Sequence, residues 1–183
     1  MTKNSIGLIE LSSIAAGYQV CDAMLKAADV EVLLSRSICS GKYMVMVRGD
    51  VAAVQASVES GSQTGDFSVI DSFVIPNLHE DVFPAITGVN KVEAIEALGI
   101  IESFSVASLI EGADAAVKAA QVRLIEIRLA MALGGKAFVT MTGSVAAVRS
   151  SVEAGARVVS AKGLLTNKVV IAHPRPELLN EIV

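Results

Sequence analysis

The sequence repeats itself, and this repeat limits the fold more than any other feature. Residues 6–30, IGLIELSSIAAGYQVCDAMLKAADV, align with residues 98–122, LGIIESFSVASLIEGADAAVKAAQV, at an offset of 92, and 11 of the 25 pairs are identical. Residues 40–61 align with residues 134–155 at an offset of 94, with 12 of 22 pairs identical. A repeat of this length is typical of a duplicated domain. The boundary is expected between residues 87 and 96, which gives one domain at 1–90 and a second at 91–183.

Both copies have the same pattern of strands and helices. In the first copy, IGLIEL is a short β-rich run, and a helix capped by serine is expected from Ser13 to Ala28. Strands at 30–38 and 42–49 precede a helix that is expected to begin at a capping Asp50 and end at Gly61. A fourth strand is expected at 67–75. The order β-α-β-β-α-β predicts an α+β fold of two tandem ferredoxin-like domains, each an antiparallel sheet with helices on one face.

The composition narrows the functional classes. Hydrophobic residues make up 52% of the chain but aromatic residues only 4%, so we expect apolar surface to be buried between subunits. Acidic residues interrupt the most apolar stretch, and Glu10 comes too early for a signal peptide, so neither a membrane helix nor export is expected. A net charge of −4 without a basic run argues against nucleic-acid binding. Two cysteines without an export signal favour an intracellular, cytoplasmic protein.

The repeated motifs IGLIE, DAMLKAADV and GDVAAVQASVESG resemble the bacterial microcompartment shell domain, and the resemblance covers nearly the whole chain. It implies an unpermuted tandem shell protein that forms a homotrimer imitating a hexamer, with a central pore. Such tiles contact themselves and other shell proteins at their edges. The resemblance places Lys26, Lys118 and Arg175 at the tile edge, with Arg175 the weaker match. The alternative for the lysines is a solvated helix face.

The resemblance also suggests a role for Cys39 in the stretch SICSGKY. In the family, the loop between the second and third strands lines the pore, which here gives Ile38, Cys39, Ser40, Gly41, Leu133, Gly134 and Gly135. Three-fold symmetry would bring three Cys39 thiols together. A subgroup of tandem shell proteins, including one from propanediol-utilising compartments, carries a [4Fe-4S] cluster at such a loop. We therefore expect Cys39 to ligate one cluster per trimer, with the flanking glycines letting backbone amides approach the sulfur.

Several alternatives remain at this point. Three free thiols also suit zinc or copper, or Cys39 lines a pore without a metal. Cys21 aligns with Ala113 and is expected to be a buried filler. Lys42 and Lys136 follow the two loops and either attract anions or point into solvent. Glu10 and Glu102 occupy equivalent strands, which suggests structural repetition rather than acid–base catalysis.

Three functions follow from these observations. The first is a shell tile whose cluster carries electrons across the shell or senses redox state, with an encapsulated redox enzyme as a candidate partner. The second is a shell tile with an open or gated pore for metabolites and no cluster. The third is a ferredoxin-like regulatory module that binds a small ligand between subunits. An enzyme is not expected, because no nucleophile–base pair or in-chain metal constellation is visible in the sequence.

Overall fold

The computed structural model describes residues 4–88, 90–92 and 94–179, and it divides into two compact units. The first unit runs to Leu78 and also includes the segment Met131–Gly135, which the sequence places in the second repeat. The second unit contains His79–Ala130 and the chain from Lys136 onward. The connecting segment after Leu78 therefore belongs with the second unit.

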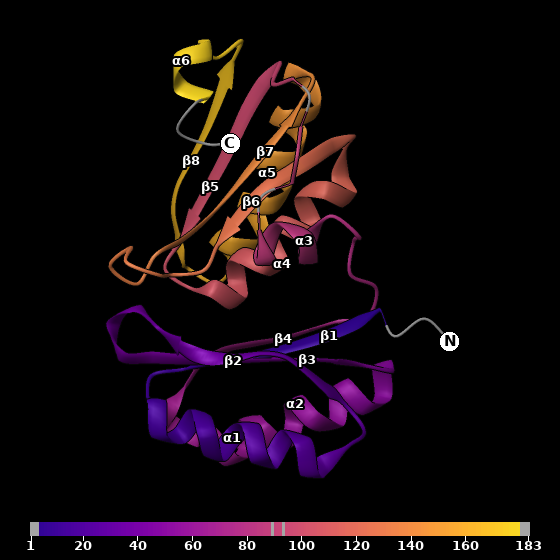
Figure 1. The fold of residues 1–183 in the computed structure, drawn as a ribbon, viewed down its shortest axis with the longest axis vertical. Helices are drawn as coiled ribbons and strands as arrows, with labels where there is room; N and C mark the ends of the chain where they lie inside the picture. The colour runs from indigo at the N-terminus through magenta and orange to yellow at the C-terminus, as the bar shows by residue number, and fades with distance from the viewer. Residues whose placement is uncertain (1–3, 89, 93, 180–183) are drawn as a thin grey trace. The chain divides into compact units, whose positions relative to one another are not determined.

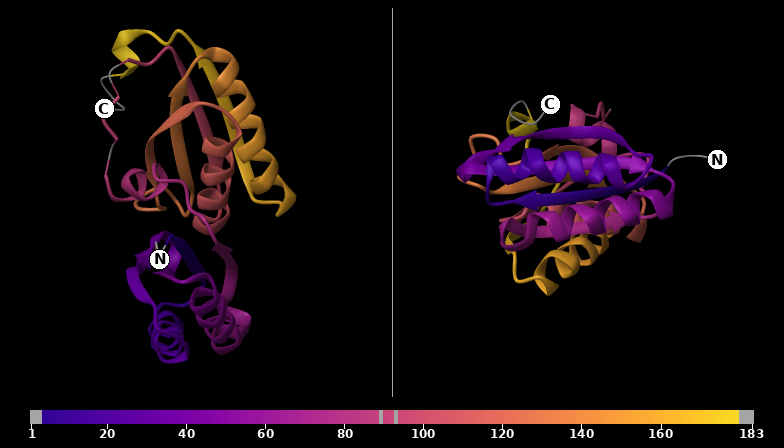
Figure 2. Two further views of the ribbon diagram at one scale, coloured as in Figure 1. Left: turned by 90° about the vertical axis from the view of Figure 1, so that its right-hand side faces the viewer. Right: turned by 90° about the horizontal axis from the view of Figure 1, so that it is seen from below.

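The first unit is a four-stranded antiparallel sheet with two helices on one face (Figure 1). Its elements are β1 (Ser5–Leu11), α1 (Ile14–Ala27), β2 (Glu31–Ile38), a 3₁₀ turn (Cys39–Gly41), β3 (Lys42–Gly49), α2 (Val51–Gly65), a second 3₁₀ turn (Asp66–Ser68) and β4 (Val69–Ile75). The strand order is β2-β3-β1-β4, so β2 and β4 are the edge strands. Figure 2 shows α1 and α2 lying side by side beneath this sheet.

The second unit repeats this architecture after a connecting helix, α3 (Val82–Thr87). It continues with β5 (Ala97–Ser103), α4 (Val106–Ala119), β6 (Val122–Arg128), β7 (Ala137–Gly143), α5 (Val145–Ala161), β8 (Leu165–Ala172) and α6 (Pro176–Leu179). The strand order is β6-β7-β5-β8, so β6 corresponds to β2 and β8 to β4. The predicted β-α-β-β-α-β order is therefore confirmed in both repeats.

Local sequence accounts for most of these boundaries. Ser13 and Ser105 occupy equivalent positions, and their hydroxyls accept hydrogen bonds from the backbone amides of Ala16 and Ser108. An N-cap side chain satisfies one of the amides that the first helical turn leaves without a partner. Alternating apolar residues from β1 and β3 pack beneath the helices and form the core of the first unit together with Val20 and Met24.

Three details of the sequence interpretation were wrong. The helix α2 continues through Gly61 to Gly65, because Gly61 faces the core rather than ending the helix. A Cβ atom at Gly61 would lie 2.6 Å from both Ile9 Cδ1 and Met24 Cγ, so glycine is needed there for close packing. Asp50 precedes α2, but its side chain makes no capping hydrogen bond. Phe67 lies outside the fourth strand and is 98% exposed.

Each repeat has an ion pair at the same place, between Glu10 of β1 and Lys42 of β3 in the first unit and between Glu102 of β5 and Lys136, just before β7, in the second. In the first unit, Lys42 Nζ lies 2.9 Å from Glu10 Oε1, and the Glu10 side chain is fully buried while Lys42 is 17% exposed. In the second unit, Lys136 Nζ lies 2.9 Å from Glu102 Oε1, with side-chain exposures of 38% for Lys136 and 28% for Glu102. The two lysines therefore neutralise carboxylates on neighbouring strands. The sequence analysis did not predict this pairing, although both the lysine and the glutamate are identical in the two repeats.

The difference in burial between these ion pairs leads to a prediction. Replacing one partner of a buried pair leaves the other charge in a poorly solvated site, which costs about 3 kcal/mol or more, whereas exposed pairs contribute under about 1 kcal/mol. We expect Lys42→Met to lower the free energy of unfolding much more than the matched Lys136→Met. Urea unfolding of both variants at one protein concentration tests this, and equal effects would contradict it.

Candidate functional site

Cys39 begins the tight turn between β2 and β3, and it is half-buried. The next two residues have left-handed backbone conformations, with φ of 64° at Ser40 and 70° at Gly41. Glycine adopts this conformation without steric cost, and serine adopts it less readily. The turn therefore holds Cys39 at the end of the hairpin, outside the paired strands.

The segment Met131–Gly135 packs against this turn within the first unit. Three of its residues have positive φ, namely Ala132 at 59°, Gly134 at 62° and Gly135 at 86°. The Ala132 amide donates to Cys39 Sγ over 2.7 Å. A Cβ atom on Gly135 would lie 2.9 Å from Ser40 Oγ, so the two loops approach too closely for a side chain there. Successive backbone amides in turns of this kind can form concave sites that favour anions.

The loop amides make the Cys39 thiol more acidic than an ordinary cysteine. The Leu133 amide has the largest effect and, with the amides of Ala132, Gly135 and Gly134, lowers the pKa of Cys39 despite the opposing effect of partial burial. A lower pKa favours the thiolate, which is the form that binds metals and attacks electrophiles. The arrangement therefore favours the thiolate form of Cys39 in each chain.

The other expected pore residues lie in the same two loops. Ser40 is exposed, Gly41 has open space around its α-carbon, and Ile38 is buried at the end of β2. Cys21 lies on α1, where it is half-buried against the core of the first unit and does not join Cys39. Within residues 4–88, 90–92 and 94–179, no three His, Cys, Asp or Glu side chains of one chain gather as a metal site. Pore lining stays a prediction, since it depends on other copies.

The three expected edge residues each have an acidic partner. Lys26 pairs with Asp22 at 2.6 Å on the exposed side of α1, and Lys118 pairs with Asp114 at 2.5 Å on α4. Arg175 pairs with Glu177 at 3.1 Å near α6. All three side chains are partly or largely exposed, as a contact with another tile requires, but their edge role stays a prediction.

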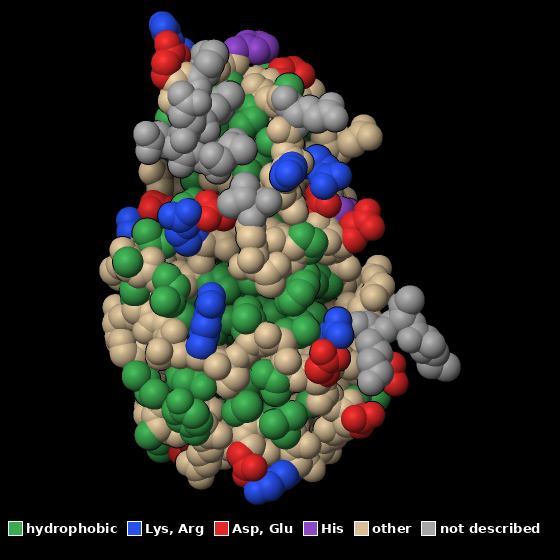
Figure 3. All heavy atoms as spheres, in the orientation of Figure 1, with side chains coloured by type: hydrophobic (Ala, Val, Ile, Leu, Met, Phe, Trp, Pro, Cys, Tyr) green, Lys and Arg blue, Asp and Glu red, His purple; other side chains and the backbone are tan. Residues whose placement is uncertain are grey.

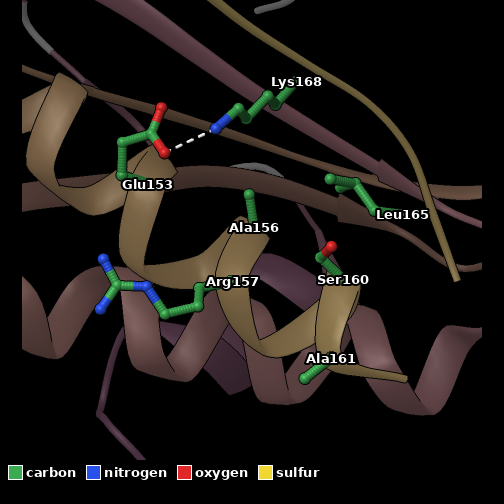
Figure 4. A pocket seen from close by; sticks show the side chains of 7 residues that line it. All are labelled: Glu153, Ala156, Arg157, Ser160, Ala161, Leu165 and Lys168. Atoms are coloured by element: carbon green, nitrogen blue, oxygen red, sulfur yellow. Dashed lines mark hydrogen bonds and ion pairs between the residues drawn. The ribbon is translucent and has the colours of Figure 1, made fainter. Parts of the chain in front are cut away.

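A separate hollow of about 390 Å³ lies between α5 and β8 in the second unit (Figure 4). Its lining contains an ion pair between Lys168 and Glu153 at 2.5 Å, and Arg157 extends from α5 beside it. The remaining lining residues are Ala156, Ser160, Ala161 and Leu165. The lining therefore consists mostly of small side chains around a satisfied ion pair.

The lowered pKa of Cys39 leads to a pH-dependent prediction. Iodoacetamide reacts with the thiolate, so a group whose pKa is depressed keeps reacting as the pH falls, until the pH passes below that pKa. We expect alkylation of Cys39 in metal-free protein to have its midpoint at a lower pH than alkylation of the free peptide SICSGKY. Mass spectrometry of the modified peptide measures both midpoints, and coincident midpoints would contradict the role of the amides.

No helix in the described part of the chain is long and apolar enough to cross a membrane. The BMC domain model matches residues 5–78 and 97–174, which are the two repeats. The chain is 41% identical over 179 residues to the bacterial microcompartment shell protein PduT of Citrobacter freundii, covering 98% of this chain and 97% of that protein. It is also 35% identical over 86 residues to PduA of the same organism, covering 45% of this chain and 90% of that shell protein.

Solved structures show the same fold. A microcompartments protein from Desulfitobacterium hafniense DCB is 52% identical and superposes with a TM-score of 0.85, covering 96% of this chain and 98% of that one. The fused permuted hexameric shell protein MSM0275 is 20% identical with a TM-score of 0.66, covering 86% of this chain and 81% of that one, which shows the shared fold alone. The resemblance drawn from the repeated motifs is confirmed: the chain belongs to the BMC domain family and is a tandem-domain shell protein of the bacterial microcompartment shell.

Proposed function

We propose that three copies of the chain form a pseudohexameric shell tile in which three Cys39 thiolates hold one [4Fe-4S] cluster at the central pore. The observation that carries this proposal is the set of loop amides at residues 132–135 that favour the Cys39 thiolate. A cluster of this type is held by cysteine thiolates, and hydrogen bonds to the sulfurs tune its potential.

The donor set fits this group. Among the described residues, each chain has one thiol at the loop and no second cysteine or histidine gathered beside it, so a site of three identical ligands needs a three-fold axis. Three thiolates leave one of four iron positions for a ligand from outside the protein. Thiolate is also a softer ligand than carboxylate or imidazole, which favours iron–sulfur clusters over hard cations.

In this proposal the tile has a structural role with a redox element, and it is not an enzyme. The cluster would accept or release single electrons, which suits electron transfer across the shell or sensing of redox state. The residues of the chain would bind it, since Cys39 is the ligand, the amides of residues 132–135 stabilise the thiolate, and Ile38 is buried where β2 meets the loop. An encapsulated redox enzyme is the proposed partner on one side of the shell.

The tile edges complete the proposal. Lys26 and Lys118 lie at equivalent positions on α1 and α4, so a trimer would present six such lysines around its perimeter in alternating environments. We propose that these lysines, together with Arg175, contact neighbouring tiles and other shell proteins. The shell itself would enclose an enzyme compartment in the cytoplasm.

Iron analysis of anaerobically purified protein tests the cluster. We expect a brown protein with about four irons and four sulfides per trimer, and we expect Cys39→Ser to be colourless and free of iron. Cys21→Ser is the matched control, because Cys21 lies on α1 away from the loop, and it should keep the full iron content.

The outcomes separate the two shell functions. A colourless wild-type protein, even after anaerobic reconstitution with iron and sulfide, would reject the cluster and support a metabolite pore. Bound zinc or copper in place of iron would support a metal site of three thiols but contradict the iron–sulfur cluster and its proposed redox role. Equal iron loss in Cys21→Ser and Cys39→Ser would assign the effect to folding rather than to ligation.

A further inference from the structure

The two repeats differ in how their edge strands are covered. In the second unit, the segment from His79 through α3 packs on the outer edge of β6 and on α4 (Figure 1). Leu124 and Ile125 of β6 are completely buried. In the first unit, the equivalent residues of β2, Val32 and Leu33, are only half-buried. An open edge strand offers unpaired backbone groups to another chain, so folded proteins usually cover it.

Polar contacts fix the covering segment in the second unit. The His79 amide donates to Asp114 Oδ1 at 2.8 Å, and Asp81 forms an ion pair with Arg123 at 3.0 Å. Asn90 continues the cover, because its backbone amide donates to the Ile125 carbonyl at 2.8 Å. The Asp114 side chain is consequently only 9% exposed, whereas its counterpart Asp22 on α1 is 62% exposed.

The strand registers identify the equivalent segment of the second repeat. Ile75 pairs with Ile6 in the first sheet, and Ile171 pairs with Leu98, the counterpart of Ile6, in the second. Counting onward from these isoleucines, Arg175 corresponds to His79 and Glu177 corresponds to Asp81. The segment after β8 thus has the same place in its repeat as the segment that covers β6.

We propose that Arg175–Leu178 of one chain docks on the C-terminal half of α1 and the outer edge of β2 in a second copy of this chain. The contact repeats, between copies, the one that His79–Thr87 makes within the second unit. It rests on the proposed trimer, since a ring of three chains presents three such tails and three such edges. A heterologous contact of this kind closes into a ring when each subunit repeats it.

The charges of the two surfaces are complementary. The tail carries Arg175 and Glu177, which are exposed and pair with each other at 3.1 Å. The receiving surface carries Asp22 at the position of Asp114, and an exposed cross-strand pair between Glu31 and Arg48 at 2.8 Å. In the docked arrangement, Arg175 lies at Asp22. The position of Arg123 is held by Glu31 in β2, so the cation for Glu177 is Arg48, the cross-strand partner of Glu31. Complementary charges of this kind set the register of an interface and exclude wrong pairings.

The receiving surface is also apolar. Leu25 in the C-terminal half of α1 is exposed, and Val32 and Leu33 of β2 are half-buried. Figure 3 shows hydrophobic side chains at the surface of the first unit. Leu178 in the tail is exposed as well. Its counterpart in the first repeat, Val82 of α3, is fully buried, which is the environment that docking would give Leu178.

Hydrogen–deuterium exchange on the full chain tests the contact. The variant Arg175→Glu with Glu177→Lys reverses both tail charges, and Arg149→Glu on the exposed side of α5 is the control. We expect residues 21–34 to exchange at least tenfold faster in the tail variant than in the wild-type trimer. Residues 113–126, which are covered within the second unit, should exchange equally in all three proteins and report that the variant is folded.

A compensating substitution gives a second readout. Adding Asp22→Arg, together with Arg48→Glu and Glu31→Arg to keep the cross-strand pair, restores opposite charges. We expect this variant to recover at least half of the lost protection. A wild-type trimer whose residues 21–34 exchange at the same rate as in the tail variant would overturn the docking contact and leave the trimer standing. A wild-type protein that is monomeric at all concentrations would overturn the proposed trimer along with it.

Discussion

The interaction between the Cys39 sulfur and the amides of residues 132–135 links the duplication to the proposed site. The thiol comes from the first repeat, while the amides come from the segment that aligns with its own loop in the second repeat. Cys39 aligns with Leu133, so the second loop lacks the ligand and keeps a tight backbone geometry. The two loops therefore differ, because the first carries the thiol and the second supplies the amides that lower its pKa.

Symmetry explains why a duplicated chain suits this arrangement. Six identical loops around one axis would bring six thiols together, more than one cubane cluster can bind, whereas three chains with two different loops bring three. The divergence between repeats extends to the ion pairs, since Glu10 is fully buried and Glu102 is not. It also extends to the edge strands, because β6 is covered within its unit and β2 is not. Each of these differences is confined to one repeat. A tile built from identical single domains would have the same feature in every domain.

Much of this architecture was predictable from the sequence. The repeat and its strand and helix pattern predicted the order of elements, and Ser13 marked the start of α1 correctly. Gly61 led to a wrong prediction of the end of α2, because glycine can either end a helix or permit close packing. Only the positions of Ile9 and Met24 in the fold show that close packing is its role here. Cys39 was singled out because of its loop, and its role as a ligand stays a prediction. The burial of Glu10 against Lys42 could not be predicted, because it depends on pairing between strands that are distant in sequence. The uncovered edge of β2 likewise could not be predicted from the sequence, because it follows from the order of the strands in the sheet.

Native mass spectrometry under anaerobic conditions tests the central claim most directly, because it counts chains and cluster in the same particle. The account predicts a trimer whose mass exceeds three apoprotein chains by one [4Fe-4S] cluster, and a Cys39→Ser trimer without the added mass. A trimer of wild-type chains that carries no iron or sulfide would contradict the cluster. Particles with one cluster in each chain would contradict the shared three-fold site.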